Sequence, residues 1–273
     1  MSKRLEMIVE LASAWAPDKK ETQGRAFCVA DVGTDHGFVP ICLVERGIAA
    51  RALALDVREG PLARAREHVK EHGLERQIDL RLGDGLKPLV PGEADMVILS
   101  GMGGELMLRI LREKSCVRTS VRRWLFSPQS ELALFRHGLA ELGLSICHEV
   151  MMEEDGKYYT MMVAEPGTMS YPEEYCYRYG QALIQSGSPI LQEYLKREAC
   201  QLMRIQRELK AEGSEGAKRR LKQVKEQLQE VELVRRKLRE WVPKEDGVGE
   251  MAAAGTEEPV RVHQQKGSPE SVL

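Results

Sequence analysis

Short apolar runs and helical stripes alternate along the first 165 residues. Apolar positions at helical spacing predict helices within residues 5–15, 38–48, 61–72 and 130–142, with a further helix over 106–111. Short apolar runs between them predict strands at 27–30, 52–55, 78–82, 96–99 and 124–126. This alternation predicts βαβ units and a mostly parallel sheet, the α/β class.

Two further apolar runs, 146–152 and 158–164, flank the turn 153–156, which reads Glu-Glu-Asp-Gly. Runs of this length around a turn of this composition predict an antiparallel hairpin. We therefore expect the hairpin to be the C-terminal, antiparallel part of the sheet.

The composition changes after Pro166, and residues 190–242 are dominated by Glu, Lys, Arg, Gln and Leu. Apolar residues recur at a/d spacing in two stretches: Leu202, Ile205 and Leu209, then Leu221, Val224, Leu228, Val231, Val234, Leu238 and Trp241. The intervening segment 213–216 predicts a turn, so we expect two antiparallel helices with a coiled-coil seam. From residue 243 onward the periodicity is lost, which predicts a disordered tail.

These shifts predict three parts: a ligand-binding α/β domain over 1–165, a helical coiled-coil domain over 166–242 and a tail over 243–273. The six cysteines form no C-x-x-C pair, which favours reduced thiols in a cytoplasmic protein and no metal site. No apolar stretch reaches about 18 residues, so no membrane span is expected. A monomer is compatible with the sequence. The net charge of −2 means that a nucleic acid would be bound by local patches.

The first strand leads into Asp31-Val32-Gly33-Thr34-Asp35-His36-Gly37. Glycine at this turn lets the backbone approach a ligand closely. The spacing departs from the dinucleotide fingerprint because Asp35 replaces the middle glycine, and its carboxylate would repel a pyrophosphate. A ligand with a cationic group and no phosphate is favoured instead. S-adenosyl-L-methionine meets that requirement, and Asp31 and Asp35 would accept hydrogen bonds from its ammonium group.

Acidic residues at the ends of the next strands extend this site. Asp56 ends the second strand, where a carboxylate accepts both hydroxyls of a ribose. Asp84 follows the third strand and would accept from an adenine amino group. Taken singly, each acid is as readily a helix N-cap or an Asx turn, but their shared position at strand ends favours a nucleoside site. The predicted cofactor-binding residues are Asp31, Gly33, Asp35, Asp56, Asp84, Gly85 and Ser100.

Four segments carry a more specific resemblance: Asp-Val-Gly-Thr-Asp-His-Gly (31–37), Leu-Gly-Asp-Gly-Leu (82–86), Leu-Ser-Gly-Met-Gly-Gly-Glu-Leu (99–106) and Glu-Glu-Asp-Gly-Lys-Tyr-Tyr (153–159). In this order they resemble the bacterial tRNA (adenine-22-N1)-methyltransferase family over roughly residues 2–240. The resemblance implies a Rossmann-like class I methyltransferase domain and a C-terminal antiparallel coiled-coil domain. It also implies S-adenosyl-L-methionine as cofactor and methyl transfer to N1 of adenine 22 in tRNA. The tail lies outside the family pattern.

The fourth strand is followed by Ser100-Gly101-Met102-Gly103-Gly104, where many adenine-N6 methyltransferases carry N-P-P-Y or D-P-P-Y. This departure disfavours N6 chemistry. Gly101, Met102 and Gly103 would leave room for an acceptor adenine, the alternative being a turn that opens the next helix. His36, oriented by Asp35, is a candidate contact to substrate or cofactor, or else a packing residue at a helix start.

Further candidates lie at the rim of the predicted site. Gln129, beyond the fifth strand, would bind a base edge or cap a helix. Of Tyr158 and Tyr159, one must face the core if both lie in a strand, so at most one stacks on a base.

Residues 190–240 hold fourteen lysines and arginines and nine acids, a composition that also suits an ordinary solvated face. The local clusters Lys218-Arg219-Arg220 and Arg235-Arg236-Lys237 predict contacts to tRNA phosphates. Two rival functions stay open at this level. One is a methyltransferase for another RNA or a small molecule, and the other is a non-catalytic nucleotide-binding scaffold that uses the coiled coil for partners.

Overall fold

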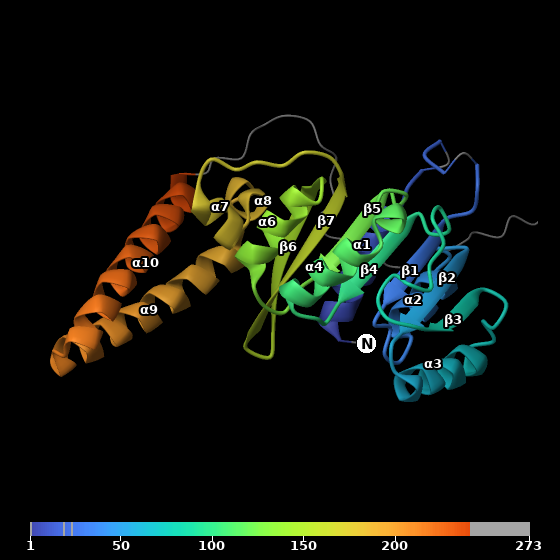
Figure 1. Cartoon of the computed structure of the whole chain (residues 1–273), viewed down its shortest axis with the longest axis horizontal. Coiled ribbons are helices and arrows are strands. Elements are labelled where there is room, and N and C mark those ends of the chain that lie inside the picture. Colours follow the sequence, from blue (N-terminus) through green and yellow to red (C-terminus); the bar gives the residue numbers. More distant parts are fainter. Residues whose placement is uncertain (1, 19, 23, 241–273) are drawn as a thin grey trace, which may run out of the picture. The chain divides into compact units, whose positions relative to one another are not determined.

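The computed structural model describes residues 2–18, 20–22 and 24–240, and its strands form one sheet (Figure 1). The sheet has seven strands in the order β3-β2-β1-β4-β5-β7-β6. The strands are β1 (Cys28–Val32), β2 (Arg51–Asp56), β3 (Ile78–Leu82), β4 (Met96–Ser100), β5 (Arg123–Ser127), β6 (Leu144–Glu154) and β7 (Lys157–Pro166). The first five are parallel, and β7 pairs antiparallel with both β5 and β6, which confirms the predicted sheet and hairpin.

Helices cover both faces of the sheet. They are α1 (Lys3–Ala14), α2 (Phe38–Glu45), α3 (Glu59–Glu71), α4 (Gly104–Glu113), α5 (Ser115–Arg118) and α6 (Leu132–Glu141). Alternate residues of one strand point to opposite faces. Val29 of β1 therefore packs with α1, α2 and α3, whereas Ala30 and Val32 pack with α4, α5 and α6. Burial on both faces explains why the central strands are continuous apolar runs rather than alternating ones.

The first strand is longer than its apolar run predicts. Asp31 and Val32 stay in register with β2 on one side and with β4 on the other, so Asp31 lies inside the strand and not after it. Ladder pairing on both sides outweighs the low strand propensity of aspartate. Asp31 is consequently buried at the carboxyl end of the sheet, with 3% of its surface exposed.

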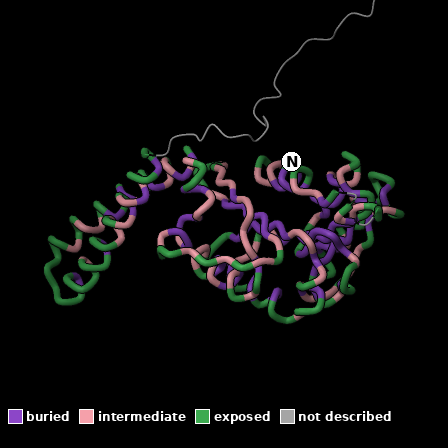
Figure 2. The backbone as a smooth tube through the Cα atoms, turned by 90° about the horizontal axis from the view of Figure 1, so that it is seen from above, coloured by how far each residue is buried: buried purple, intermediate pink, exposed green. Residues whose placement is uncertain are grey.

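The C-terminal part consists of α7 (Glu174–Tyr179), α8 (Gln181–Gln185), α9 (Pro189–Glu212) and α10 (Glu215–Glu240). Ser188 begins α9 by accepting a hydrogen bond from the Leu191 amide, and Gly213 ends it with φ +68°. The predicted seam residues Leu202, Val224 and Val231 are buried between the two long helices, while the turn that joins these helices is exposed (Figure 2). Two packed helices are thus confirmed; a coiled-coil supercoil stays a prediction. Trp241 and the predicted tail lie outside the described residues.

A buried ion pair links α6 and the hairpin to the C-terminal helices. Arg136 Nε lies 2.8 Å from Glu149 Oε1, and both side chains are fully buried. The same guanidinium donates through Nη1 to the carbonyl oxygens of Tyr177 and Arg178. Because a buried polar group is costly without a hydrogen-bond partner, the two carbonyls from this helical part help to stabilise the Arg136 guanidinium inside the sheet domain. In the described part of the chain, no helix has the length and apolar character to cross a membrane.

Candidate active site

The carboxyl ends of the parallel strands enclose two cavities that meet at Gly33 and Met102. The Asp31 cavity, of about 420 Å³, is lined by Arg4, Leu5, Asp31, Gly33, Thr34, Asp35, His36, Phe38, Val39, Arg58, Ser100, Gly101, Met102 and Gln129. The Asp56 cavity, of about 130 Å³, is lined by Val32, Gly33, Leu55, Asp56, Val57, Gly83, Asp84, Gly85, Met102, Leu106, Arg109 and Ile110. Every predicted cofactor-binding residue lines one of them, at the edge where open α/β sheets bind ligands.

Gly33 forms the junction between the two cavities. Its φ of +77° belongs to the left-handed region, and its amide donates to the Leu55 carbonyl over 2.8 Å. A Cβ atom at this position would lie 2.8 Å from Met102 Cε. The left-handed backbone favours glycine here, and a side chain would also have to displace the terminal methyl group of Met102.

Asp31 is a buried carboxylate that no cation of the described chain pairs with, since none of its ion pairs includes this residue. Burial raises the pKa of Asp31 to about 6; a hydrogen bond with Thr34 acts against this shift, and the nearby Asp56 carboxylate adds to it. A buried charge is costly unless it is paired. Because Asp31 lines the larger cavity, a cationic group in that cavity would supply the missing partner.

Asp35 and His36 lie at the rim of the Asp31 cavity. Asp35 has a φ of +51°, uncommon for a residue with a side chain, and about half of that side chain is exposed. Its Oδ2 lies 3.5 Å from His36 Nε2, so the predicted pairing of these neighbours is present. The His36 ring stacks with Phe38 and His68, and His68 Nδ1 lies 2.9 Å from the His36 carbonyl oxygen. His36 therefore combines packing with a position on the cavity wall.

Asp56 is 5% exposed and organises the turn around it. Its two oxygens accept from the amides of Asp35, over 3.2 Å, and Arg58, over 2.9 Å. A carboxylate has about four acceptor positions. Arg58 Nε also lies 3.8 Å from Oδ1. The carboxylate keeps acceptor positions for the paired hydroxyls of a ribose in the Asp56 cavity.

Asp84 and Gly85 line the other wall of the Asp56 cavity. Asp84 Oδ2 lies 2.7 Å from Lys87 Nζ, and this hydrogen bond lowers the pKa of Asp84. Gly85 has a φ of +56°, and a Cβ atom there would lie 2.9 Å from Ile110 Cγ2. Close packing under α4 thus excludes a side chain at position 85.

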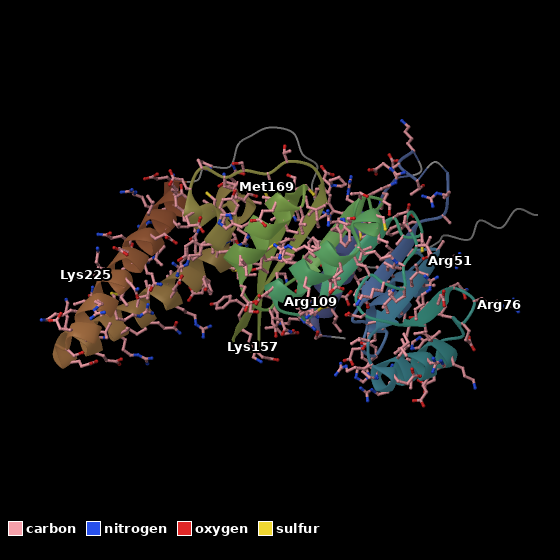
Figure 3. All side chains as sticks on the ribbon, viewed as in Figure 1. Arg51, Arg76, Arg109, Lys157, Met169 and Lys225 are labelled. Atoms are coloured by element: carbon pink, nitrogen blue, oxygen red, sulfur yellow. The ribbon has the colours of Figure 1, made fainter. Side chains whose placement is uncertain are left out.

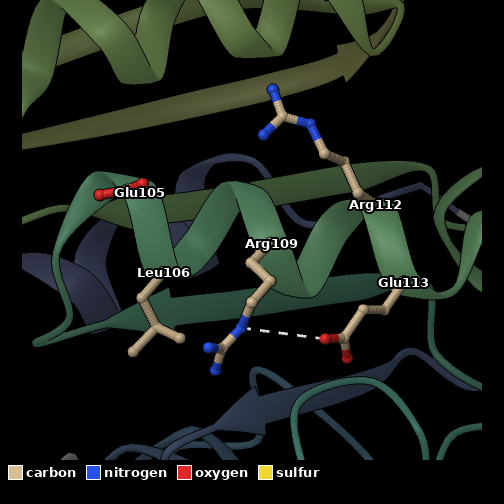
Figure 4. A pocket seen from close by; sticks show the side chains of 5 residues that line it. All are labelled: Glu105, Leu106, Arg109, Arg112 and Glu113. Atoms are coloured by element: carbon tan, nitrogen blue, oxygen red, sulfur yellow. Dashed lines mark ion pairs between the residues drawn. The ribbon is translucent and has the colours of Figure 1, made fainter.

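Leu106 and Arg109 of α4 point toward the same side, away from Arg112 (Figure 4). These two residues line the Asp56 cavity and also a hollow of about 650 Å³ along α4. Arg109 Nε lies 3.8 Å from Glu113 Oε1. All the lining residues of this hollow come from one helix, so it is a surface feature of α4 that shares Leu106 and Arg109 with the Asp56 cavity.

The turn after β4 contributes Ser100, Gly101 and Met102 to the Asp31 cavity. Gly101 has a φ of +78°, and its amide donates to the Ser127 carbonyl. Gly103 lies beside them but lines neither cavity. A Cβ atom at Gly103 would lie 2.9 Å from Ser130 Oγ, so this glycine accommodates the loop after β5 rather than a ligand.

Arg4 and Phe38 line the Asp31 cavity and were not among the predicted site residues. Arg4 Nη1 is buried and has no hydrogen-bond partner, although its guanidinium lies over the Tyr159 ring. No motif marks Arg4, because only the packing of α1 against the sheet brings it to the cavity. The sequence does mark Phe38, which is 47% exposed, because it is an aromatic residue directly after a glycine turn.

Tyr158 and Tyr159 point to opposite faces of β7, as predicted. Tyr159 packs with the apolar cluster that includes α1. Tyr158 lies on the other face, where its ring meets that of Tyr194 edge-on with 5.2 Å between centroids.

The predicted tRNA-binding clusters lie at the two ends of α10. Lys218, Arg219 and Arg220 are exposed near its start, although Lys218 pairs with Glu215. Arg235, Arg236 and Lys237 lie near its end, where Arg235 pairs with Glu232 and Arg236 with Glu240. At about 1.5 Å per residue the clusters are roughly 25 Å apart, so they cannot contact the same phosphate. Lys225 projects between them (Figure 3).

The polar groups of the two cavities fit S-adenosyl-L-methionine. Asp31 has no cation partner and suits the ammonium group, while the unpaired Nη1 of Arg4 suits the carboxylate. Asp56 suits the ribose hydroxyls, and Asp84 lies beyond it for the adenine. Within residues 2–18, 20–22 and 24–240, no group of three or more His, Cys, Asp or Glu residues is arranged to hold a metal ion.

Known proteins agree with this assignment. A model of the tRNA (adenine(22)-N(1))-methyltransferase family, TrmK, matches residues 29–233. The Bacillus subtilis tRNA (adenine(22)-N(1))-methyltransferase is 34% identical over 167 residues, which span 61% of this chain and 66% of the relative. The alignment thus covers slightly less than two thirds of that relative's length.

Solved structures extend the likeness to the helical part. That of the B. subtilis m1A22 tRNA methyltransferase has a TM-score of 0.72 and 27% identity, covering 86% of this chain and 98% of the other. Streptococcus pneumoniae Sp1610 in complex with S-adenosyl-L-methionine has a TM-score of 0.73 and 30% identity, covering 86% and 99%. With a family match over most of its length and a site that fits the cofactor, this chain belongs to the S-adenosyl-L-methionine-dependent tRNA (adenine(22)-N(1))-methyltransferase family.

Proposed function

We propose that the protein methylates N1 of adenine 22 in tRNA, in the cytoplasm, where unmodified tRNA is available to it. The observation that carries the proposal is Asp31, a buried carboxylate without a cation partner that faces a cavity at the end of the sheet. A phosphate-bearing dinucleotide would place negative charge near this carboxylate and near Asp35. A sulfonium cofactor with an ammonium group places positive charge there instead.

The cofactor supplies an electrophilic methyl group, and the chain has to bind it and bring the acceptor in line with it. Adenine N1 has an available lone pair, so the reaction needs no general base. Gly101 and Met102 line the Asp31 cavity, where the acceptor base would meet the methyl group of the cofactor, and Gln129 offers a polar side chain there. Holding two reactants in line can supply ~7–11 kcal/mol of the barrier reduction.

The Asp35 carboxylate at the rim of the Asp31 cavity suits a product that is a cation. Adenine gains positive charge as N1 is methylated. The exposed carboxylate of Asp35 lies at the rim, where its negative charge stabilises that positive charge. Because N1 is hidden in a paired or stacked base, the target has to be unpaired or flipped out to reach the cavity.

In this proposal residues 1–165 hold the cofactor and the acceptor base, and the C-terminal part, residues 166–242, binds the tRNA backbone. The net positive charge of residues 190–240 supports phosphate contacts, with fourteen basic and nine acidic residues. In the exposed cluster Lys218-Arg219-Arg220 one residue is paired with an acid, whereas two are paired in the other predicted cluster.

The proposal is tested with purified full-length protein, S-adenosyl-L-methionine and unmodified tRNA transcripts. We expect one methyl group per tRNA, mapped by mass spectrometry to N1 of adenine 22, and no transfer when position 22 is guanine. Calorimetry of cofactor binding separates the rivals. Cofactor binding without transfer to any tRNA would favour another substrate, and no cofactor binding would favour a scaffold.

A further inference from the structure

A third cavity, of about 350 Å³, lies where the sheet domain meets the C-terminal helices. We call it the junction cavity. The β5–α6 loop forms one wall, and Tyr158 of β7, Tyr179 of α7 and Tyr194 of α9 lie around the rest. Gln129 lines both this cavity and the Asp31 cavity, so the two open on either side of one loop. The volume is within the range of small-ligand pockets.

The β5–α6 loop is held firmly between the two cavities. The backbone amide of Gln129 donates to the Met102 carbonyl over 2.9 Å, and the backbone amide of Gly104 donates to the Ser130 carbonyl over 3.1 Å. Glu131, the last residue before α6, has a φ of +53°, a left-handed conformation that glycine adopts far more readily. Bonds to the turn after β4 thus fix the wall that separates the acceptor side from the junction cavity.

Arg178, the cation that lines the junction cavity, is already paired with acids. Arg178 lies 2.6 Å from Glu198 and 3.3 Å from Glu230, and the Tyr179 hydroxyl donates to Glu198. Glu131 accepts from the Ser130 hydroxyl. A phosphate would therefore meet no unpaired cation among the lining residues. A flat, uncharged group would instead find the Tyr158 and Tyr194 rings, the Met151 side chain and the Gln129 side-chain amide. The Arg197 guanidinium lies over the Tyr158 ring, 5.3 Å from its centroid, and donates to its hydroxyl, so a base would stack on the Tyr158 face that Arg197 leaves open.

We propose that the junction cavity binds an unpaired nucleobase of the substrate tRNA, adjacent in sequence to the target adenine, with Tyr158 as its stacking platform. The inference rests on the proposed function. Aromatic side chains stack on unpaired bases of any sequence, and the side-chain amide of Gln129 can form hydrogen bonds with a base edge. A base held here fixes the backbone on one side of the target and so orients the adenine in the neighbouring Asp31 cavity.

The test uses tRNA transcripts that lack a single base at position 21 or 23, with a transcript lacking one anticodon-loop base as the control. Affinity is measured by filter binding for the wild-type protein and for Tyr158→Leu and Tyr158→Phe. For the wild type, we expect about tenfold weaker binding when one of the two neighbouring bases is missing. Tyr158→Leu should bind complete tRNA about tenfold more weakly and lose its sensitivity to that missing base. Tyr158→Phe keeps the ring and should behave like the wild type.

Thermal melting and cofactor calorimetry verify that the variants fold. If Tyr158→Leu does not, Ala133→Leu replaces it, because it fills the cavity without removing a contact of Tyr158. Equal affinity of the wild type for complete and neighbour-abasic tRNA would overturn the inference alone, provided that complete tRNA is methylated. Persistent sensitivity in the folded Leu variants would also overturn it. Failure to methylate complete tRNA would overturn the proposed function and this inference together.

Discussion

At the scale of single residues, Asp31 couples cofactor binding to pH. Its folded-state pKa of about 6 lies above the ordinary value of 3.8. A cationic ligand interacts best with the ionised form, so we expect cofactor affinity to fall as the pH drops from 8 through 6 to 5. Calorimetric titrations at these pH values measure the effect. Asp31→Asn should bind weakly at every pH. The exposed Asp79→Asn, paired with Arg81 away from the cavities, should keep the wild-type profile.

The same carboxylate has the opposite effect on the ligand-free fold. An acid whose pKa is raised by folding stabilises the protein when protonated. That contribution is lost as the pH rises from about 4 through 6. The difference from 3.8 to about 6 corresponds to roughly 3 kcal/mol. Asp31→Asn should therefore raise the melting temperature of the ligand-free protein at pH 8 and change it little at pH 4. An unchanged melting temperature at pH 8 would mean that Asp31 is solvated in the folded state.

Asp56 takes part both in the proposed cofactor binding and in the turn that follows β2, and two substitutions distinguish these roles. Asp56→Ala removes a charged acceptor from the ribose site and should weaken cofactor binding by about 1.5–3 kcal/mol, or roughly ten- to a hundredfold. Because Asp56 also accepts from two backbone amides, Asp56→Asn is the better matched variant, since one oxygen stays to hold the turn. Calorimetric affinity equal to wild type in a folded Asn variant would reject the ribose role.

At the scale of elements, two glycines of the turn after β4 have different roles: Gly101 lies at a cavity wall, and Gly103 packs against the β5–α6 loop. Gly101→Ala adds a methyl group at a cavity wall where the nearest atoms are 3.8 Å away or more, with a backbone strain of about 1 kcal/mol. It should reduce methyl transfer to tRNA more than cofactor affinity. Gly103→Val would instead collide with the Ser130 and Glu131 side chains of the β5–α6 loop and break their packing. Its melting temperature should fall further than that of Gly101→Ala, whose strain of about 1 kcal/mol corresponds to a shift of only about 2–4 °C.

Most elements follow from apolar periodicity because each buries a face with a regular repeat. The strands of the parallel sheet, the hairpin and the two long helices were all predictable in this way. Acids and glycines at strand ends located the two cavities, since parallel strands end at one edge. Arg4 and the junction cavity were not predictable. Both depend on how α1 and α7–α9 pack against the sheet, which no local pattern records.

At the scale of the whole molecule, the buried pair Arg136–Glu149 decides how tRNA binding has to be tested. Deleting residues 170–242 would remove the Tyr177 and Arg178 carbonyls that accept from Arg136, and would expose the apolar residues under α7 and α8. We therefore expect the truncated protein to be strongly destabilised. Substitutions within the intact chain are the informative experiment.

Reversing Lys218, Arg219 and Arg220 to glutamate changes an exposed face of α10 and leaves its buried seam intact. If the cluster contacts phosphates, tRNA affinity should fall, and the slope of log affinity against log salt should decrease by roughly 0.7–0.9 for each lost contact. Cofactor affinity should not change, because every cofactor contact proposed here lies on the sheet domain. The matched control reverses Arg66, Lys70 and Arg76, an equal charge change on exposed residues of the α3–β3 region. Equal affinities and slopes for the two triple variants would show that net charge, and not this cluster, attracts the tRNA.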